Sequence, residues 1–323
     1  MFRFLVLAAA VATAITANTA SFAANPKLVL PATAPTAAPS VTVIAGTPLT
    51  INAGSDHTFQ ILNSAIPGSG QIYPSGATGT ADMGWFVRIG SAKFAPDFSQ
   101  HPSGTATSSI GTNTAWTPGT LSARTGAGTS ADPFKVTVTN ALPSTALNST
   151  QEISYVNGEN FFRKKFTLSN SSATSVSASV FLGADIYLAS SDTGIPQRVS
   201  GSPGGKDCGA GTYNILMIPQ GSVAPLNYSA KGYDTVWAEI GAGTLSNTVA
   251  TGCIDNGAAL QWNVTVPANG SVSVEAATSF GVIPGALITP PAASTPVPTM
   301  SSFAIALLML SVIGLGIRRY RRQ

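Results

Sequence analysis

The sequence predicts an all-β fold, a large antiparallel β-sandwich followed by a single C-terminal transmembrane helix. Three observations predict it. β-branched runs are separated by Gly, Pro, Asn and Ser clusters at short spacing. Charged residues make up only 9% of the chain, and small polar residues take their place, which is typical of extracellular β proteins with many turns. An apolar run close to the C-terminus is long enough to cross a thin membrane as one helix.

Residues 1–23 have the pattern of a secretory signal peptide. Arg3 gives a positive start, Phe4–Ile15 is an apolar core, and Ser-Phe-Ala at 21–23 is a small-x-small cleavage signal. We expect cleavage after Ala23, since an uncut anchor would need a longer apolar core. Residues 24–40 follow as a Pro-rich, extended leader.

Residues 41–283 are expected to form the β-sandwich. The clearest strand is Thr174–Leu188, where apolar and polar residues alternate and Gly183 suggests a bend. Asn160–Ser169 alternates too, and 170–172 is expected to join these two strands as a hairpin. Lys164 falls on the inward side of its strand, which suggests a bulge or a position at the rim of the sheet.

A second hairpin is expected near the end of this domain. Leu260–Val266 and Val272–Phe280 both alternate, and Pro-Ala-Asn-Gly at 267–270 turns the chain between them. Trp262 is therefore placed in the core. Helical patterns are not evident in the domain. Shorter strands are expected at Val41–Ile44, His57–Leu62, Gly84–Ile89, Phe134–Thr139, Glu152–Val156 and Tyr213–Ile218, and long loops at Phe98–Ala131.

The two cysteines, Cys208 and Cys253, are expected to form a disulfide in an oxidising compartment. A two-cysteine metal site is the alternative, but His57 and His101 are distant in sequence and no CxxC motif occurs.

A metal site is also considered at Asp185 and Asp192, which lie near the end of the longest predicted strand and before a Gly turn. Calcium is the ion considered, because hard cations take several oxygen ligands from loops. The spacing of an EF-hand is absent, and an Asx-turn is the commoner use of a residue such as Asp192. The prediction is therefore no cofactor, with calcium as the alternative.

Trp85 and Trp116 are candidates for stacking on a sugar ring, with packing in the core as the alternative. Trp116 lies in a Thr-Pro-Gly context and is expected to be exposed. No GxSxG, HExxH or P-loop motif occurs, and no catalytic residue is predicted.

The C-terminal residues predict a membrane address. Residues 284–299 form a Pro-rich stalk, the uncharged run 300–317 is the transmembrane helix, and 318–323 is a basic tail that the positive-inside rule places in the cytoplasm. A buried core helix is the alternative, but the run is apolar on every face. The arginines of the tail are Arg318, Arg319, Arg321 and Arg322.

This order of elements, with Val297, Pro298 and Thr299 before the helix, resembles the IPTL-CTERM sorting signal of bacterial surface proteins, a relative of the PEP-CTERM signals. Met300 and Ser301-Ser302-Phe303 depart from its usual residues. The resemblance covers about the last 28 residues and implies an exosortase-type processing enzyme as a partner.

The predicted function follows from the predicted cellular location and from the composition. Without the signal peptide and the tail, eleven basic residues face thirteen acidic ones, so the exported part carries a formal charge of −2 and nucleic acid is not expected as a partner. We expect a protein at the cell envelope or surface with a structural, adhesive or matrix role and no catalysis. The alternative is a carbohydrate-binding module or glycan-active enzyme that contacts extracellular glycan.

Overall fold

The computed structural model describes residues 38–76, 79–101 and 110–288. The predicted signal peptide, apolar helix and basic tail lie outside these residues, as do all but the ends of the two Pro-rich segments. Among the described residues, no helix is long and apolar enough to span a membrane. The strands run from Val41 to Phe280.

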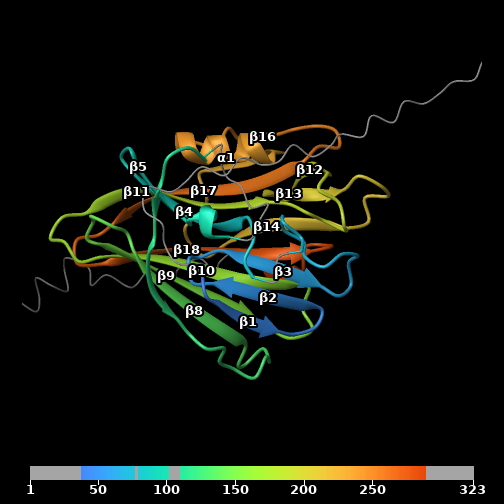
Figure 1. Ribbon diagram of the computed structural model, residues 1–323, viewed down its shortest axis with the longest axis horizontal. Coiled ribbons are helices and arrows are strands. Elements are labelled where there is room, and N and C mark those ends of the chain that lie inside the picture. Colours follow the sequence, from blue (N-terminus) through green and yellow to red (C-terminus); the bar gives the residue numbers. More distant parts are fainter. Residues whose placement is uncertain (1–37, 77–78, 102–109, 289–323) are drawn as a thin grey trace, which may run out of the picture.

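Two large sheets pack face to face, and a smaller sheet extends one edge of the core (Figure 1). The eight-stranded sheet has, in spatial order, β12 (Gly194–Val199), β13 (Ser202–Asp207), β14 (Asn214–Gln220), β18 (Ser271–Phe280), β10 (Phe161–Asn170), β9 (Leu147–Tyr155), β8 (Phe134–Ala141) and β7 (Thr117–Leu121). The seven-stranded sheet has β16 (Thr248–Val249), β15 (Asn227–Gly232), β17 (Asn256–Val266), β11 (Val176–Asp185), β4 (Met83–Ile89), β5 (Ala92–Ala95) and β6 (Thr114–Ala115). The three-stranded sheet has β1 (Val41–Ala45), β2 (Leu49–Gly54) and β3 (Phe59–Asn63).

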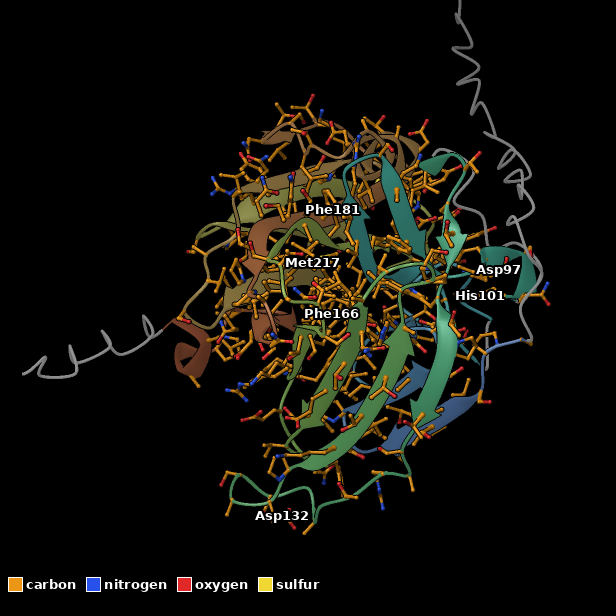
Figure 2. All side chains as sticks on the ribbon, turned by 90° about the vertical axis from the view of Figure 1, so that its left-hand side faces the viewer. Asp97, His101, Asp132, Phe166, Phe181 and Met217 are labelled. Carbon is orange, nitrogen blue, oxygen red and sulfur yellow. A yellow bond between two sulfur atoms is a disulfide. The ribbon has the colours of Figure 1, made fainter. Side chains whose placement is uncertain are left out.

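Nearly all neighbouring strands are antiparallel, so the predicted all-β sandwich is confirmed; the short pairs β15/β16 and β5/β6 are parallel. The inward faces meet in one apolar core, in which Phe166 stacks on Trp85 at 4.9 Å between ring centroids. Figure 2 shows Phe166 in the middle of the molecule. Trp262 is fully buried, as predicted.

Both predicted hairpins are wrong. β10 and β11 lie in different sheets, and so do β17 and β18. Each pair has one apolar face, and those faces bury more surface when they pack across the sandwich than when they lie side by side. The two connections run next to each other, since Asn170 N–H donates to Gly270 O at 2.8 Å and Asn269 N–H donates to Ser172 O at 2.9 Å.

A helix that the sequence did not reveal covers the outer face of the seven-stranded sheet. α1 (Tyr233–Ala242) packs Trp237 and Ile240 against Phe86 and Phe181. Gly183 belongs to this contact: a Cβ there would lie 2.6 Å from the Trp237 ring. The glycine lets the helix approach the sheet, and β11 continues through it in regular register with β17. Two shorter helices, η1 (Phe98–Gln100) and α2 (Gly285–Ile288), complete the fold.

Lys164 points into the core, which corrects the predicted bulge or rim position. It pairs in regular register with Ala276 and is 1% exposed. Its amine hydrogen-bonds with the Thr278 hydroxyl and lies 4.7 Å from the Phe162 ring centroid. Burial lowers the pKa of Lys164 well below its ordinary value.

The buried His57 is expected to make the free energy of unfolding depend on pH. It is buried, its Nε2 is 2.8 Å from the Ser149 hydroxyl, and the Trp116 and Phe166 rings pack edge-on against it. Burial lowers the pKa of His57 to about 3, although the nearby charge of Asp56 acts in the opposite direction. His57 therefore binds a proton near pH 6.5 in the unfolded chain but only near pH 3 in the folded chain.

We expect the free energy of unfolding to fall by about 2 kcal/mol between pH 6.5 and pH 4.5, at up to about 1.4 kcal/mol per pH unit. Urea unfolding of the wild type and of His57→Gln across this range measures the slope. The variant is expected to be less stable and to lose most of the slope. An unchanged slope in His57→Gln would show that another group carries the acid sensitivity.

Candidate functional site

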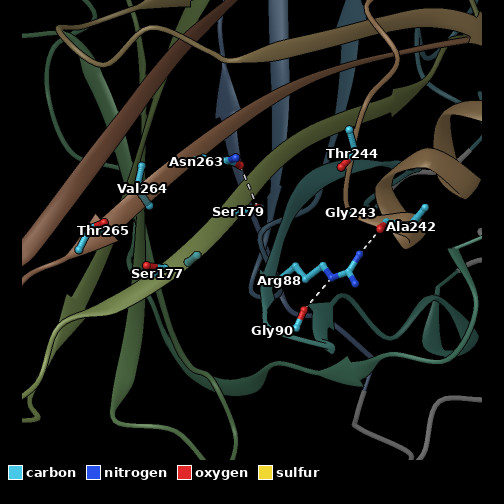
Figure 3. A pocket seen from close by; sticks show the side chains of 11 residues that line it. Arg88, Gly90, Ser177, Ser179, Ala242, Gly243, Thr244, Asn263, Val264 and Thr265 are labelled. Atoms are coloured by element: carbon cyan, nitrogen blue, oxygen red, sulfur yellow. Dashed lines mark hydrogen bonds between the residues drawn. The ribbon is translucent and has the colours of Figure 1, made fainter.

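A polar pocket of about 500 Å³ opens on the outer face of the seven-stranded sheet (Figure 3). Residues from β4, β11 and β17 line it together with the end of α1. Hydroxyl and amide side chains dominate its wall. The lining residues are Arg88, Gly90, Ser177, Ala178, Ser179, Ala242, Gly243, Thr244, Asn263, Val264 and Thr265.

Strand register and helix length together create this pocket. β11 and β17 pair so that Ser177 lies opposite Thr265 and Ser179 lies opposite Asn263, all on the outward face. α1 covers the apolar middle of that face and stops at Ala242, where Gly243 takes a left-handed conformation at φ 89°. The polar ends of the two strands are therefore left open to solvent.

Asn263 is held in place at the floor of the pocket. Its Oδ1 accepts from the Ser179 hydroxyl at 2.9 Å and from Gln261 Nε2 at 3.1 Å. Both bonds use the carbonyl end of the amide, so the Nδ2 donor stays available for a ligand. The hydroxyls of Ser177 and Thr265 make no hydrogen bond within the described part of the chain and offer further donors and acceptors.

Arg88 is fixed at the side of the pocket next to α1. Its Nε donates to Gly90 O at 2.8 Å, and its Nη1 donates to Ala242 O, one of the last carbonyls of the helix. Gly243 makes room for it, because a Cβ at that position would clash with the Arg88 guanidinium. The guanidinium therefore has a defined position before any ligand binds.

Three carboxylates form a second cluster at the opposite end of the same strands. Asp185 ends β11, Asp192 lies in the loop before β12, and Asp255 precedes β17. One oxygen from each lies within 4.8 Å of the others. Asp185 is buried and the other two are half-buried. The two aspartates singled out in the sequence are thus brought together, with Asp255 added by the fold.

Backbone bonds and the disulfide hold this cluster in shape. Gly194 and Ile254 exchange two hydrogen bonds of 2.8 and 3.0 Å, which ties the Asp192 loop to the Asp255 segment. The predicted disulfide between Cys208 and Cys253 is confirmed, with the two Cα atoms 5.6 Å apart. The carboxylates suit a hard cation in ligand type, and calcium binding there stays the untested alternative to the prediction of no cofactor.

A partly buried ion pair joins the chain segment that contains η1 to the turn between β2 and β3. His101 Nε2 is 2.7 Å from Asp56 Oδ2; Figure 2 shows His101 beside Asp97 at the edge of the molecule. Burial alone would lower the pKa of His101, but the charge of Asp56 and the hydrogen bond to it, with Asp82 and Asp97, raise that pKa above its usual value. The pair is structural, because it fixes this segment against the turn between β2 and β3.

The pocket and the carboxylate cluster are separate sites. Ser179 and Asp185 lie on the same strand six residues apart, which corresponds to about 20 Å at the rise of a β-strand. The Tyr233 N–H at the start of α1 donates to Asp255 O at 3.0 Å, whereas the pocket adjoins the end of the helix. One small ligand therefore does not contact both.

The predicted stacking residues do not form a sugar platform. Trp85 is fully buried and Trp116 is 2% exposed, so the expected exposure of Trp116 is wrong. Trp116 packs against Phe94 and His57, and Trp85 against Phe166 and Trp262. The sorting-signal residues, Val297, Pro298, Thr299, Arg318, Arg319, Arg321 and Arg322, lie outside the described residues.

None of the pocket residues was predicted from the sequence as a functional residue. The alternation in Thr174–Leu188 and Leu260–Val266 does place Ser177, Ser179, Asn263 and Thr265 on the outward faces of two strands. The signal that could have found them is this repeated outward placement of hydroxyls and amides on strands that turn out to be neighbours. Arg88 carried no local signal, because its role depends on the position of α1.

No family model matches the chain, and no curated protein matches it. The chain does match solved structures. A bacterial glucoamylase complexed with acarbose is 10% identical, with 79% of this chain and 35% of that chain covered, at a TM-score of 0.43. A protein assigned as an aldose 1-epimerase from Escherichia coli K12 is 8% identical, with 76% and 100% covered, at 0.39. A galactose mutarotase-like protein from Clostridium acetobutylicum is 6% identical, with 75% and 95% covered, at 0.40.

These matches correct the expected structural, adhesive or matrix role without catalysis. The three structures described above carry the names of carbohydrate-active proteins, in agreement with the alternative drawn from the sequence. The chain spans only about a third of the glucoamylase. At these identities and TM-scores the likeness assigns no activity or substrate to this chain, so a functional proposal has to rest on its own residues.

Proposed function

We propose that this protein binds carbohydrate in the open polar pocket on the seven-stranded sheet. The observation that carries the proposal is the lining of the pocket, where five hydroxyl or amide side chains surround a volume of about 500 Å³. Ligand sites commonly have volumes of about 300 to 1,000 Å³. Sugar hydroxyls both donate and accept hydrogen bonds, and Ser, Thr and Asn side chains do the same.

Asn263 is expected to be the main donor to the sugar. Because Ser179 and Gln261 already fix its carbonyl end, the amide loses little freedom when it binds. Loss of a hydrogen bond costs about 1 to 3 kcal/mol of binding free energy when it leaves a ligand hydroxyl unsatisfied. Asn263→Ala should therefore weaken binding roughly tenfold.

A glycan array probed with the full-length chain, followed by calorimetry on the glycans that bind, measures this effect. Asn148→Ala is the matched control, because Asn148 is an exposed strand asparagine on the other large sheet. Equal affinity of wild type and Asn263→Ala, or no glycan bound at all, would contradict the proposal. The bound glycans are then assayed for cleavage.

A glycan-active enzyme is the second candidate function, and the carboxylate cluster favours it. Retaining glycosidases use two carboxyl groups about 5 to 5.5 Å apart, one as an acid and one as a nucleophile. Asp192 and Asp255 are both half-buried and have oxygens within 4.8 Å of each other. Binding in the pocket and chemistry at this cluster would then be separate activities at opposite ends of β11 and β17.

We also propose that the protein is exported and held at the cell envelope at least transiently. The support is the order of sequence features at both ends, together with a disulfide, which is typical of oxidising compartments. The C-terminal apolar run would supply the contact with the membrane, and an exosortase-type enzyme would process it.

A further inference from the structure

We propose that the open pocket selects an acidic saccharide, one whose carboxylate or sulfate group is bound by the guanidinium of Arg88. This inference rests on the proposed carbohydrate-binding function and specifies the class of glycan. Among the eleven lining residues, Arg88 is the only one that ionises, so no acid in the pocket wall opposes a negative ligand. Arginine stays charged under all ordinary conditions.

The guanidinium has donors left for a ligand. Of its five N–H groups, two are used by Gly90 O and Ala242 O. Three remain, and no acidic residue in the described part of the chain forms an ion pair with Arg88. Carboxylate and sulfate oxygens match such a planar set of donors, because two parallel charge-assisted bonds can form at once.

A second positive charge lies beside the first. Lys93 on β5 is the direct cross-strand partner of Arg88 on β4. Its amine donates to Ile110 O at 2.9 Å, and it has no acidic partner among the described residues either. Like charges directly opposite each other on a sheet destabilise it. An anionic ligand would offset the repulsion between Arg88 and Lys93, so this pair of cations favours a site for an anion.

The C-terminus of α1 acts against an anion but does not outweigh the two cations. Its carbonyls amount to about half a negative charge, and Arg88 already caps one of them. The full positive charge of Arg88 exceeds this partial negative charge, and Lys93 adds a second positive charge from the neighbouring strand, outside the lining of the pocket. The formal charge of −2 on the exported part gives no general attraction for anions, so preference for an acidic glycan should be local to this site.

The test uses matched glycans that differ only in charge. The full-length chain is titrated with trigalacturonate and its methyl ester, and with a sulfated galactose trisaccharide and its unsulfated form. We expect the acidic member of at least one pair to bind roughly tenfold more tightly, because hydrogen bonds to charged groups contribute about 1.5 to 3 kcal/mol. Which pair shows the effect distinguishes carboxylate from sulfate. Added salt should reduce the preference.

Arg88→Gln should abolish the preference for the acidic member of each pair, and a preference that persists in this variant overturns the inference. Arg198→Gln is the control, since Arg198 is exposed on β12 and lies over the Tyr228 ring at 4.0 Å. If Arg88→Gln fails to fold, Lys93→Gln replaces it and should reduce the preference several-fold. Equal binding of acidic and neutral members by the wild type overturns this inference and leaves carbohydrate binding standing. No binding of any array glycan overturns both.

Discussion

Trp262→Ala is expected to lower the free energy of unfolding by about 3 to 5 kcal/mol, because removal of a buried indole leaves a large cavity. The ring is fully buried at the centre of β17, opposite Val180 of β11. The ring centroids of Trp262 and Trp85 are 5.7 Å apart, and Trp262 Nε1 donates to Val223 O at 3.1 Å. The variant loses both the packing and this hydrogen bond.

Urea unfolding of Trp262→Ala and Trp262→Phe measures the effect. The Phe variant keeps most of the apolar volume, so it should lose clearly less stability than the Ala variant. A loss below about 1 kcal/mol for Trp262→Ala would contradict the inward orientation of this strand face, since a register shift of one residue reverses every side chain.

Removal of the disulfide is expected to cost about 4 kcal/mol in the chain-entropy model. Cys208 and Cys253 are 45 residues apart, and the bond closes a loop that contains β14, β15 and α1. The double variant Cys208→Ser with Cys253→Ser should therefore unfold at a clearly lower urea concentration than the oxidised wild type.

Reduced wild type is the control for this comparison, and it should unfold close to the double variant. An unchanged urea midpoint in both would show that the disulfide contributes little to stability. The bond also holds the Asp255 segment, so a calcium effect on stability, if calcium binds the three carboxylates, should be weaker in the double variant.

Local alternation in the sequence identified the strands well and their partners poorly. The inward parity of β11 and the burial of Trp262 both followed from period-two patterns. The hairpins failed because a short polar turn fits a connection between two sheets as well as one within a sheet. Asn170 shows this: its Nδ2 donates to Thr174 O at 2.8 Å and to Pro267 O at 3.1 Å, across both connections.

The helix α1 and the pocket depend on tertiary contacts that the sequence does not display. The helix has no side-chain N-cap and buries only Val236, Trp237 and Ile240, so its pattern is short and weak. Since the pocket exists only where α1 ends, it could not be placed without the fold. The disulfide could be predicted, because the chain has only two cysteines.

The sequence pointed to two of the three carboxylates in this cluster. Asp185 and Asp192 lie close in sequence, and the turn between them brings them together. Asp255 joins them because β11 and β17 are neighbours, with Asp185 opposite Gly257. Sequence spacing cannot reveal a contact made by strand pairing across about 70 residues.

A crystal structure of the protein with the tightest-binding glycan from the array tests the central claim most directly. We expect sugar in the pocket between the ends of β11 and β17 and the end of α1, with Asn263 Nδ2 donating to a sugar hydroxyl. Glycan bound at any other place on the molecule, with this pocket holding only water, would contradict it.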